Sequence, residues 1–134
     1  MIYLGNFLFL TNQEAADPNE RRHGSFNLVV NAEDESTAVA LFRTRIEQYR
    51  EESSFFEGNC DIFFLHLLEF DRFPDNQAVM INYRSQAGDP VFPYIECAAP
   101  LSDNNACKIH EWHQNQPATE GKAEECFLRF KNNR

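Results

Sequence analysis

Four side chains in the C-terminal third have the chemistry of a zinc site. Cys107, His110, His113 and Cys126 follow the spacing C-x2-H-x2-H-x12-C, and thiolate and imidazole are the ligands that zinc prefers in a closed tetrahedral site. The common zinc fingers instead need a C-x2-C pair or an H-x3-H to H-x5-H pair. A helix or loop over residues 107–113 would let these ligands converge, whereas a strand would separate them. The ordinary alternative is two surface histidines beside a Cys126 that seeks the core.

A second cluster lies in the polar stretch 12–24, which reads as a long loop. Arg21, Arg22 and His23 form the one concentrated positive patch of an acidic chain. An Arg guanidinium presents a fixed fork of donors that suits a phosphate or a carboxylate. One hypothesis is therefore an anion or small-ligand site here, and the ordinary interpretation is a solvated loop tip.

Thiol catalysis needs a cysteine, a neighbouring histidine and an orienting group. Cys60 or Cys97 with His66 would supply the first two, but both cysteines lie in strand-like patterns, where small thiols are common core residues. His66 lies within an apolar run, which predicts a buried, hydrogen-bonded histidine. The chain has no Gly-rich phosphate loop and no G-x-S-x-G or H-E-x-x-H motif. We assign no catalytic residue, and a metal- or thiol-dependent enzyme using residues 107–113 stays an alternative.

Length and composition bound the class of protein. A chain of 134 residues predicts a single domain, with residues 1–100 as the core and 101–134 as a polar extension. A hydrophobic fraction of 43%, with 13 Phe, excludes general disorder. A formal net charge of -9 repels phosphate, so nucleic acid and anionic membranes are not expected as partners. Without a membrane-length apolar run or a targeting segment, we expect a cytoplasmic protein with reduced thiols and no resident cofactor other than the zinc considered above.

The strands that must carry these residues are predicted from alternation. The run CDIFFLHLLEF, Cys60–Phe70, is apolar on both faces if extended and predicts an interior strand. Residues 2–11 have the same character, and residues 26–32 alternate as a half-buried strand. Further strands are predicted at 78–84 and, as an edge or irregular strand because of two prolines, at 91–98.

One helix is predicted, and its start is the clearest local signal. Asp34 caps an apolar periodicity of three and four residues that runs from Ala38 to Tyr49. The junction VVNAEDESTAVALF resembles the strand–helix units of many small α+β domains, a local likeness that implies no function. Phe55 and Phe56, which follow the helix, are expected to tuck under its end. The C-terminus is predicted as a β-hairpin of residues 108–112 with 126–130, or as a short helix.

These elements predict an α+β fold with a single antiparallel sheet of about five strands and one helix on one face. A crossover connection leaves room for the first strand between the second and the central strand, so the expected order is second, first, central, fourth, fifth. A single helix leaves the other sheet face to be covered, and exposed apolar patches usually mark interfaces. The sequence therefore favours a non-enzymatic interaction or regulatory module that associates with a protein partner or with itself through a sheet face or edge.

Overall fold

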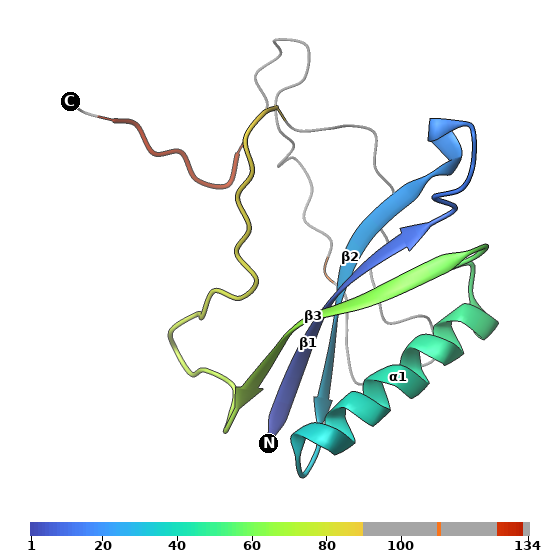
Figure 1. The fold of residues 1–134 in the computed structure, drawn as a ribbon. Coiled ribbons are helices and arrows are strands. Elements are labelled where there is room, and N and C mark those ends of the chain that lie inside the picture. The colour runs from blue at the N-terminus through green and yellow to red at the C-terminus, as the bar shows by residue number, and fades with distance from the viewer. Residues whose placement is uncertain (90–109, 111–125, 133–134) are drawn as a thin grey trace. The chain divides into compact units, whose positions relative to one another are not determined.

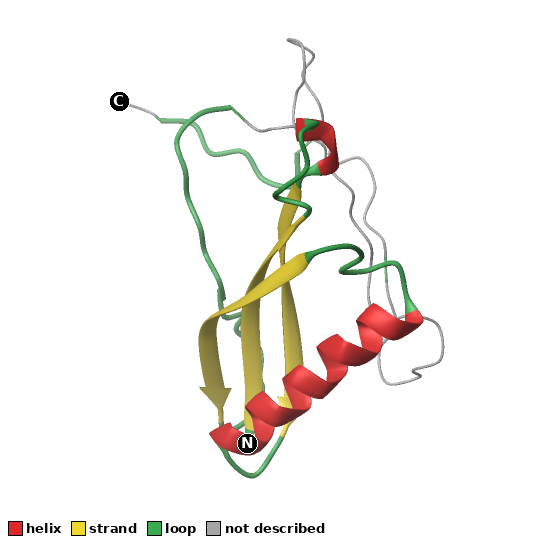
Figure 2. Cartoon of the chain, turned by 45° about the vertical axis from the view of Figure 1, so that its right-hand side comes forward, coloured by secondary structure: helices red, strands yellow, loops and turns green. Residues whose placement is uncertain are grey.

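The computed structural model describes residues 1–89, 110 and 126–132, and the chain divides into two units, Met1–Gln86 and Ala87–Arg134. The elements of the first unit are, in chain order, β1 (Ile2–Thr11), the 3-10 helix η1 (Pro18–Glu20), β2 (Arg22–Asn31), α1 (Glu35–Glu52) and β3 (Cys60–Phe70). The strands form an antiparallel sheet in the order β2-β1-β3, and α1 lies on one face (Figures 1 and 2). The α+β class, the antiparallel sheet and the order of its first three strands are confirmed.

The predicted cap starts α1. Asp34 has extended backbone geometry, and its Oδ1 accepts a hydrogen bond from the backbone N–H of Thr37 at 2.8 Å. This bond satisfies one of the amides that a helix start leaves without a partner. The same bond lowers the pKa of the Asp34 carboxyl, because it stabilises the charged form.

The core lies between α1 and the two strands that the helix covers. Its buried residues are Tyr3 and Phe7 of β1 and Ala38 and Phe42 of α1. Tyr3 and Phe7 are at odd positions of β1, so the odd side chains of this strand point toward the helix. The ring of Phe7 makes an edge contact with Phe42 at 5.8 Å and stacks on Phe26 of β2 at 5.1 Å, measured between centroids. The helix therefore packs over β1 and β2.

The connection from α1 to β3 is packed as predicted. Phe56 lies 5.0 Å from Phe26, and Phe55 lies 5.8 Å from Tyr49, between ring centroids. Arg50 Nη1 donates hydrogen bonds to the carbonyl oxygens of Phe56 and Gly58. These contacts hold the connection of residues 53–59 against β2 and against the end of α1.

The predicted fourth strand and C-terminal hairpin are not confirmed. Residues 78–84 form irregular chain, in which Asn82 has a left-handed backbone (φ 53°) that interrupts an extended run. Residues 126–132 form neither helix nor strand. Side chains such as Leu128 and Phe130 are exposed, so little apolar burial offsets the loss of conformational entropy that a regular element would require. Three further predictions lie outside the described residues: the strand at 91–98, the boundary at residue 100, and the hairpin arm 108–112 except for His110.

The absence of a fourth strand among the described residues changes the place of β3. We expected Cys60–Phe70 in the middle of the sheet, but within the described part of the chain β3 pairs only with β1 and lies at the sheet edge. The loop before β2 is also shorter than expected, because β2 begins at Arg22. The described helices include none that is long and apolar enough to span a bilayer.

Gly5 is required by the close packing of aromatic rings on β1. A Cβ at this position would lie 2.8 Å from Phe7 Cε2 and 2.9 Å from Phe42 Cε2. We expect Gly5→Ala to lower the free energy of unfolding by about 1–3 kcal/mol, because buried rings must shift. Urea unfolding measures this, with Ser25→Ala at an exposed position of β2 as the control. Equal stability of the two variants would contradict the packing.

The cap at Asp34 predicts a pH dependence. The pKa of this carboxyl is lower in the folded state, so its stabilisation is present above the unfolded pKa and is lost as the pH falls through the folded pKa. We expect Asp34→Ala to lower the melting temperature at pH 7 and to have a smaller effect near pH 3. Asp34→Asn keeps an acceptor for Thr37, so it should retain most of the stability while removing this contribution to the pH profile.

Candidate functional site

The site is the edge of β3, and its geometry begins with a bulge. Asn6 of β1 pairs with His66, whereas the next residue, Phe7, pairs with Phe64, so Leu65 is an extra residue on β3. A bulge of this kind bends a strand and increases its local twist. Its position fixes which β3 side chains point toward α1 and which point away.

Three consecutive large apolar side chains are exposed at this bulge. Phe63 is 45% exposed, Phe64 43% and Leu65 37%. Phe64 is on the α1 side of the sheet, where its ring lies 4.8 Å from that of Phe7, and Phe63 is on the opposite side because neighbouring strand residues alternate. Apolar surface is therefore exposed on both faces of the same strand.

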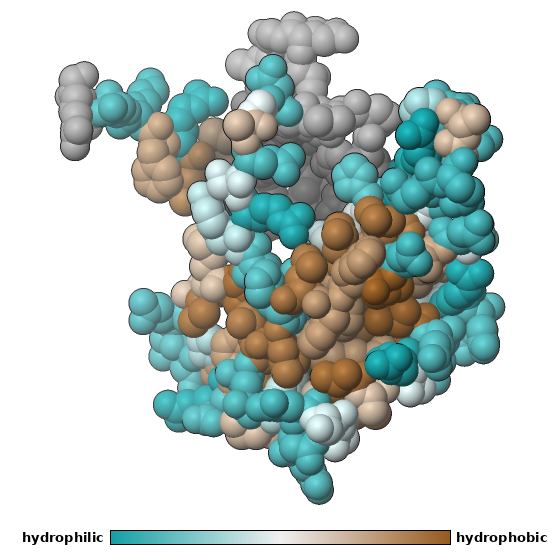
Figure 3. All heavy atoms as spheres, viewed as in Figure 1, coloured by the Kyte–Doolittle hydropathy of each residue, from teal (hydrophilic) through white to brown (hydrophobic). Residues whose placement is uncertain are grey.

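The arrangement of α1 explains this exposure. The helix packs over β1 and β2 and makes few contacts with β3, so the α1-side residues of β3 are only partly covered. Figure 3 shows apolar side chains gathered over β3 and in the space between β3 and α1. We call the side of β3 that has no strand partner among the described residues the open edge. Half the backbone N–H and C=O groups of such a strand point away from its partner.

A polar row crosses the opposite sheet face at the level of the bulge. Asn27, Asn6 and His66 stand side by side on β2, β1 and β3, and we call these three residues the polar row. Asn6 is only 7% exposed, and its Nδ2 donates a hydrogen bond to Asn27 Oδ1 at 3.0 Å. Asn27 Oδ1 also accepts from Nδ2 of Asn82 at 2.6 Å. The chain that follows β3 therefore touches this face at Asn82.

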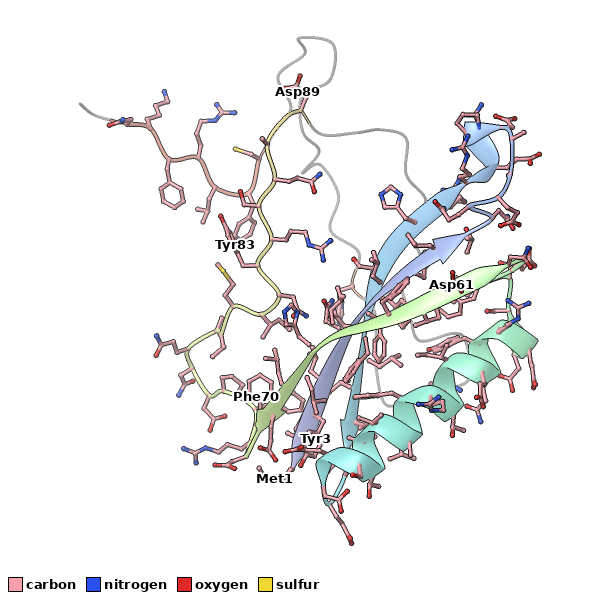
Figure 4. The ribbon with its side chains drawn as sticks, viewed as in Figure 1. Met1, Tyr3, Asp61, Phe70, Tyr83 and Asp89 are labelled. Carbon is pink, nitrogen blue, oxygen red and sulfur yellow. The ribbon has the colours of Figure 1, made fainter. Side chains whose placement is uncertain are left out.

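The charges of β3 lie at its two ends. Asp61 is the second residue of the strand (Figure 4), and Glu69 is the last but one. Glu69 Oε1 accepts a hydrogen bond of 2.7 Å from the hydroxyl of Tyr3. This bond, together with burial, raises the pKa of Tyr3 to about 12. The middle of the open edge consequently has no acidic or basic residue except His66.

The predicted anion site, Arg21, Arg22 and His23, spans the start of β2. Arg21 caps η1, and its Nη2 donates to the carbonyl of Ala16 at 3.2 Å. Arg22 and His23 are successive residues of β2, so their side chains point to opposite faces of the sheet. The structure therefore does not bring these three side chains together on one face.

The predicted zinc ligands fall largely outside the described residues. Cys107 and His113 are outside them, while His110 and Cys126 are described and exposed. Within the described ranges, no group of three or more His, Cys, Asp or Glu side chains could hold a metal ion. The site formed by all four residues stays a prediction.

The described cysteine–histidine pair of the thiol hypothesis is separated along one strand. Cys60 and His66 are both on β3, and an extended strand places residues six apart at roughly 20 Å. Cys60 is half-buried, and this burial raises the pKa of its thiol, which disfavours the nucleophilic thiolate. His66 is exposed, so its predicted burial in the core is wrong. Cys97 lies outside the described residues.

Sequence reasoning missed both parts of the site. It took the apolar faces of Cys60–Phe70 as a sign of burial, and it gave Asn6, Asn27 and Asn82 no role. A signal was available for the polar row, because Asn6 interrupts a strand that is otherwise apolar on its even positions. No such signal marks the exposure of Phe63 and Phe64.

The chain matches no protein-family model, and it has no significant match among curated proteins or solved structures. The interpretation of the open edge therefore depends on its own geometry.

The bond from Tyr3 to Glu69 predicts an alkaline transition. The bond to Glu69 raises the pKa of Tyr3 from its ordinary value of 10.0 to about 12 in the folded protein, so its stabilisation is present below pH 10 and is lost as the pH rises toward 12. We expect Tyr3→Phe to lose less stability than the wild type between pH 10 and pH 12, measured by urea unfolding. Tyr49→Phe, which keeps the Tyr3 bond, is the control. The same alkaline slope in wild type and Tyr3→Phe would contradict this assignment.

Proposed function

We propose that this protein is a small, non-enzymatic interaction module of the cytoplasm, which associates with a second copy of itself through the open edge of β3. The observation that supports this most is the exposure of Phe63, Phe64 and Leu65 on a strand whose outer backbone groups are unpaired among the described residues. Exposed apolar side chains and an unpaired edge together are the requirements for strand addition.

The composition of β3 also favours pairing with another strand. Proteins commonly protect edge strands with lysine, with proline or with an inward-pointing charge. Between Cys60 and Phe70 there is no lysine, arginine or proline, and the two acids are at the strand ends. In the middle of this strand, the bulge at Leu65 is the one protective feature.

A second copy fits this edge because β3 is self-complementary. An antiparallel pair of β3 strands centred on Phe64 would place Phe64 opposite Phe64 and Phe63 opposite Leu65. Such apolar cross-strand contacts stabilise a sheet. A two-fold axis would then relate the two chains and close the assembly as a dimer. The net charge of -9 on each copy opposes this association at long range, and salt screens that repulsion.

A lysine at the open edge should separate the copies. We expect Leu65→Lys to weaken self-association by about tenfold or more, because the strand pair would have to bury two ammonium groups at its centre. Sedimentation velocity over a range of protein concentrations measures the association. Leu41→Lys is the matched control, because Leu41 is 43% exposed but is on α1, away from the strand edge.

The same measurement has two outcomes that would overturn the proposal. The first is a wild-type protein that stays monomeric at every concentration, both at low salt and after screening of the acidic charge. The second is equal weakening by Leu65→Lys and Leu41→Lys, which would mean that added charge and not the edge controls association.

A further inference from the structure

We propose that residues 78–84 are an alternative fourth strand, which pairs antiparallel with the open edge of β3 in its own chain. Closing the edge in this way would exclude the second copy. The regulatory part of this inference rests on the proposed function, whereas the strand pairing itself does not.

The side chains of residues 78–84 suit a strand better than the irregular chain that they form. Val79, Ile81 and Tyr83 alternate along it, and β-branched and aromatic residues favour strands. All three side chains are exposed, as is Met80 between them. Figure 4 shows Tyr83 on the chain that follows β3, outside the sheet. The segment thus carries apolar side chains that sheet pairing would bury.

Asn82 keeps the segment out of the sheet. Its backbone is left-handed at φ 53°, and a residue in that conformation cannot continue a strand ladder. Asn accepts this conformation more readily than other residues that have a side chain. Its Nδ2 also donates to Asn27 Oδ1 at 2.6 Å. Among the described residues, this backbone torsion and this amide hydrogen bond favour the irregular form.

The connection to β3 is suited to a hairpin. Residues 71–77 join the two segments and contain Pro74 and the left-handed Asn76 (φ 58°), both typical of turns. If this connection is the hairpin loop, Phe70 pairs with Ala78, and each step back along β3 is one step forward along residues 78–84.

This register matches both faces of the sheet. Ile81 would lie beside Leu67, which already packs against the core on the α1 side. Asn82 would lie beside His66 and extend the polar row onto a fourth strand. Apolar and polar residues are thus continued on their own faces, a match that a shift of one residue would reverse.

Pairing within the chain competes well with pairing between copies. The short connection gives residues 78–84 a high effective concentration at the edge of β3, whereas a second copy must come from solution. The hairpin also involves no approach of two acidic chains. The equilibrium at Asn82 therefore sets the fraction of molecules whose edge is open.

Two substitutions at Asn82 isolate this equilibrium. Asn82→Val and Asn82→Gly both remove the hydrogen bond to Asn27, but valine disfavours the left-handed conformation and glycine permits it. We expect Asn82→Val to slow hydrogen exchange of the outward amides of β3 and of residues 79–83 by about tenfold relative to Asn82→Gly. Exchange is measured by mass spectrometry at a dilution where the protein is monomeric, after unfolding curves show that both variants are folded.

The outcomes separate this inference from the proposed function. Slower exchange in Asn82→Val, together with weaker self-association than in Asn82→Gly, supports the whole inference. Slower exchange in a protein that never associates supports the hairpin and overturns the proposed function. Equal exchange in the two variants overturns the hairpin. That conclusion holds even if Leu65→Lys shows that the wild type associates through the open edge. Protection that increases with protein concentration overturns pairing within the chain, because it assigns the strand to a neighbouring copy.

Discussion

One helix covers two strands of a three-stranded sheet, and the rest of the described unit depends on that constraint. The ring of Phe7 is at the centre, in contact with Phe26 of β2, Phe42 of α1 and Phe64 of β3. Phe42 is on α1 and Phe26 is on β2, which α1 covers. Phe64 is on β3, which α1 covers only partly, and its side chain is exposed. A core built on this aromatic group leaves apolar surface at β3 as a direct consequence.

The polar row decides how that surface can be used. A partner that buried the whole helix-free face would have to satisfy the amide groups of Asn6 and Asn27 and the imidazole of His66, because unpaired buried polar groups are costly. Asn6 and Asn27 already bond to each other, and Asn82 completes this arrangement. A strand added from a second copy would meet β3 through backbone hydrogen bonds and leave these bonds intact. The edge is therefore the better contact surface than the face.

Local signals in the sequence were sufficient for the elements themselves. Alternation located Ile2–Thr11 and Cys60–Phe70, and the Asp34 cap located the start of α1. The neighbours of each strand were not available from the same signals. An apolar pattern indicates which side chains are stable when buried, but it does not reveal that Asn82 has a left-handed torsion, in the segment that was predicted to cover them. Likewise, Arg21, Arg22 and His23 are adjacent in sequence, yet pairing of Arg22 with Thr11 divides them between two faces.

The net charge limits how many copies can associate through the open edge, which its apolar side chains alone would not do. A strand with exposed Phe63, Phe64 and Leu65 and no lysine or proline has the composition of an aggregation site. Each further copy would add a net charge of -9 to the assembly, so repulsion grows with every addition, while the gain from one strand pair stays the same. The proposed self-pairing of β3 would also use both open edges at once, which would leave neither for a third chain. In the proposed dimer, acidity and two-fold pairing would together favour a small, closed and reversible assembly over a fibre.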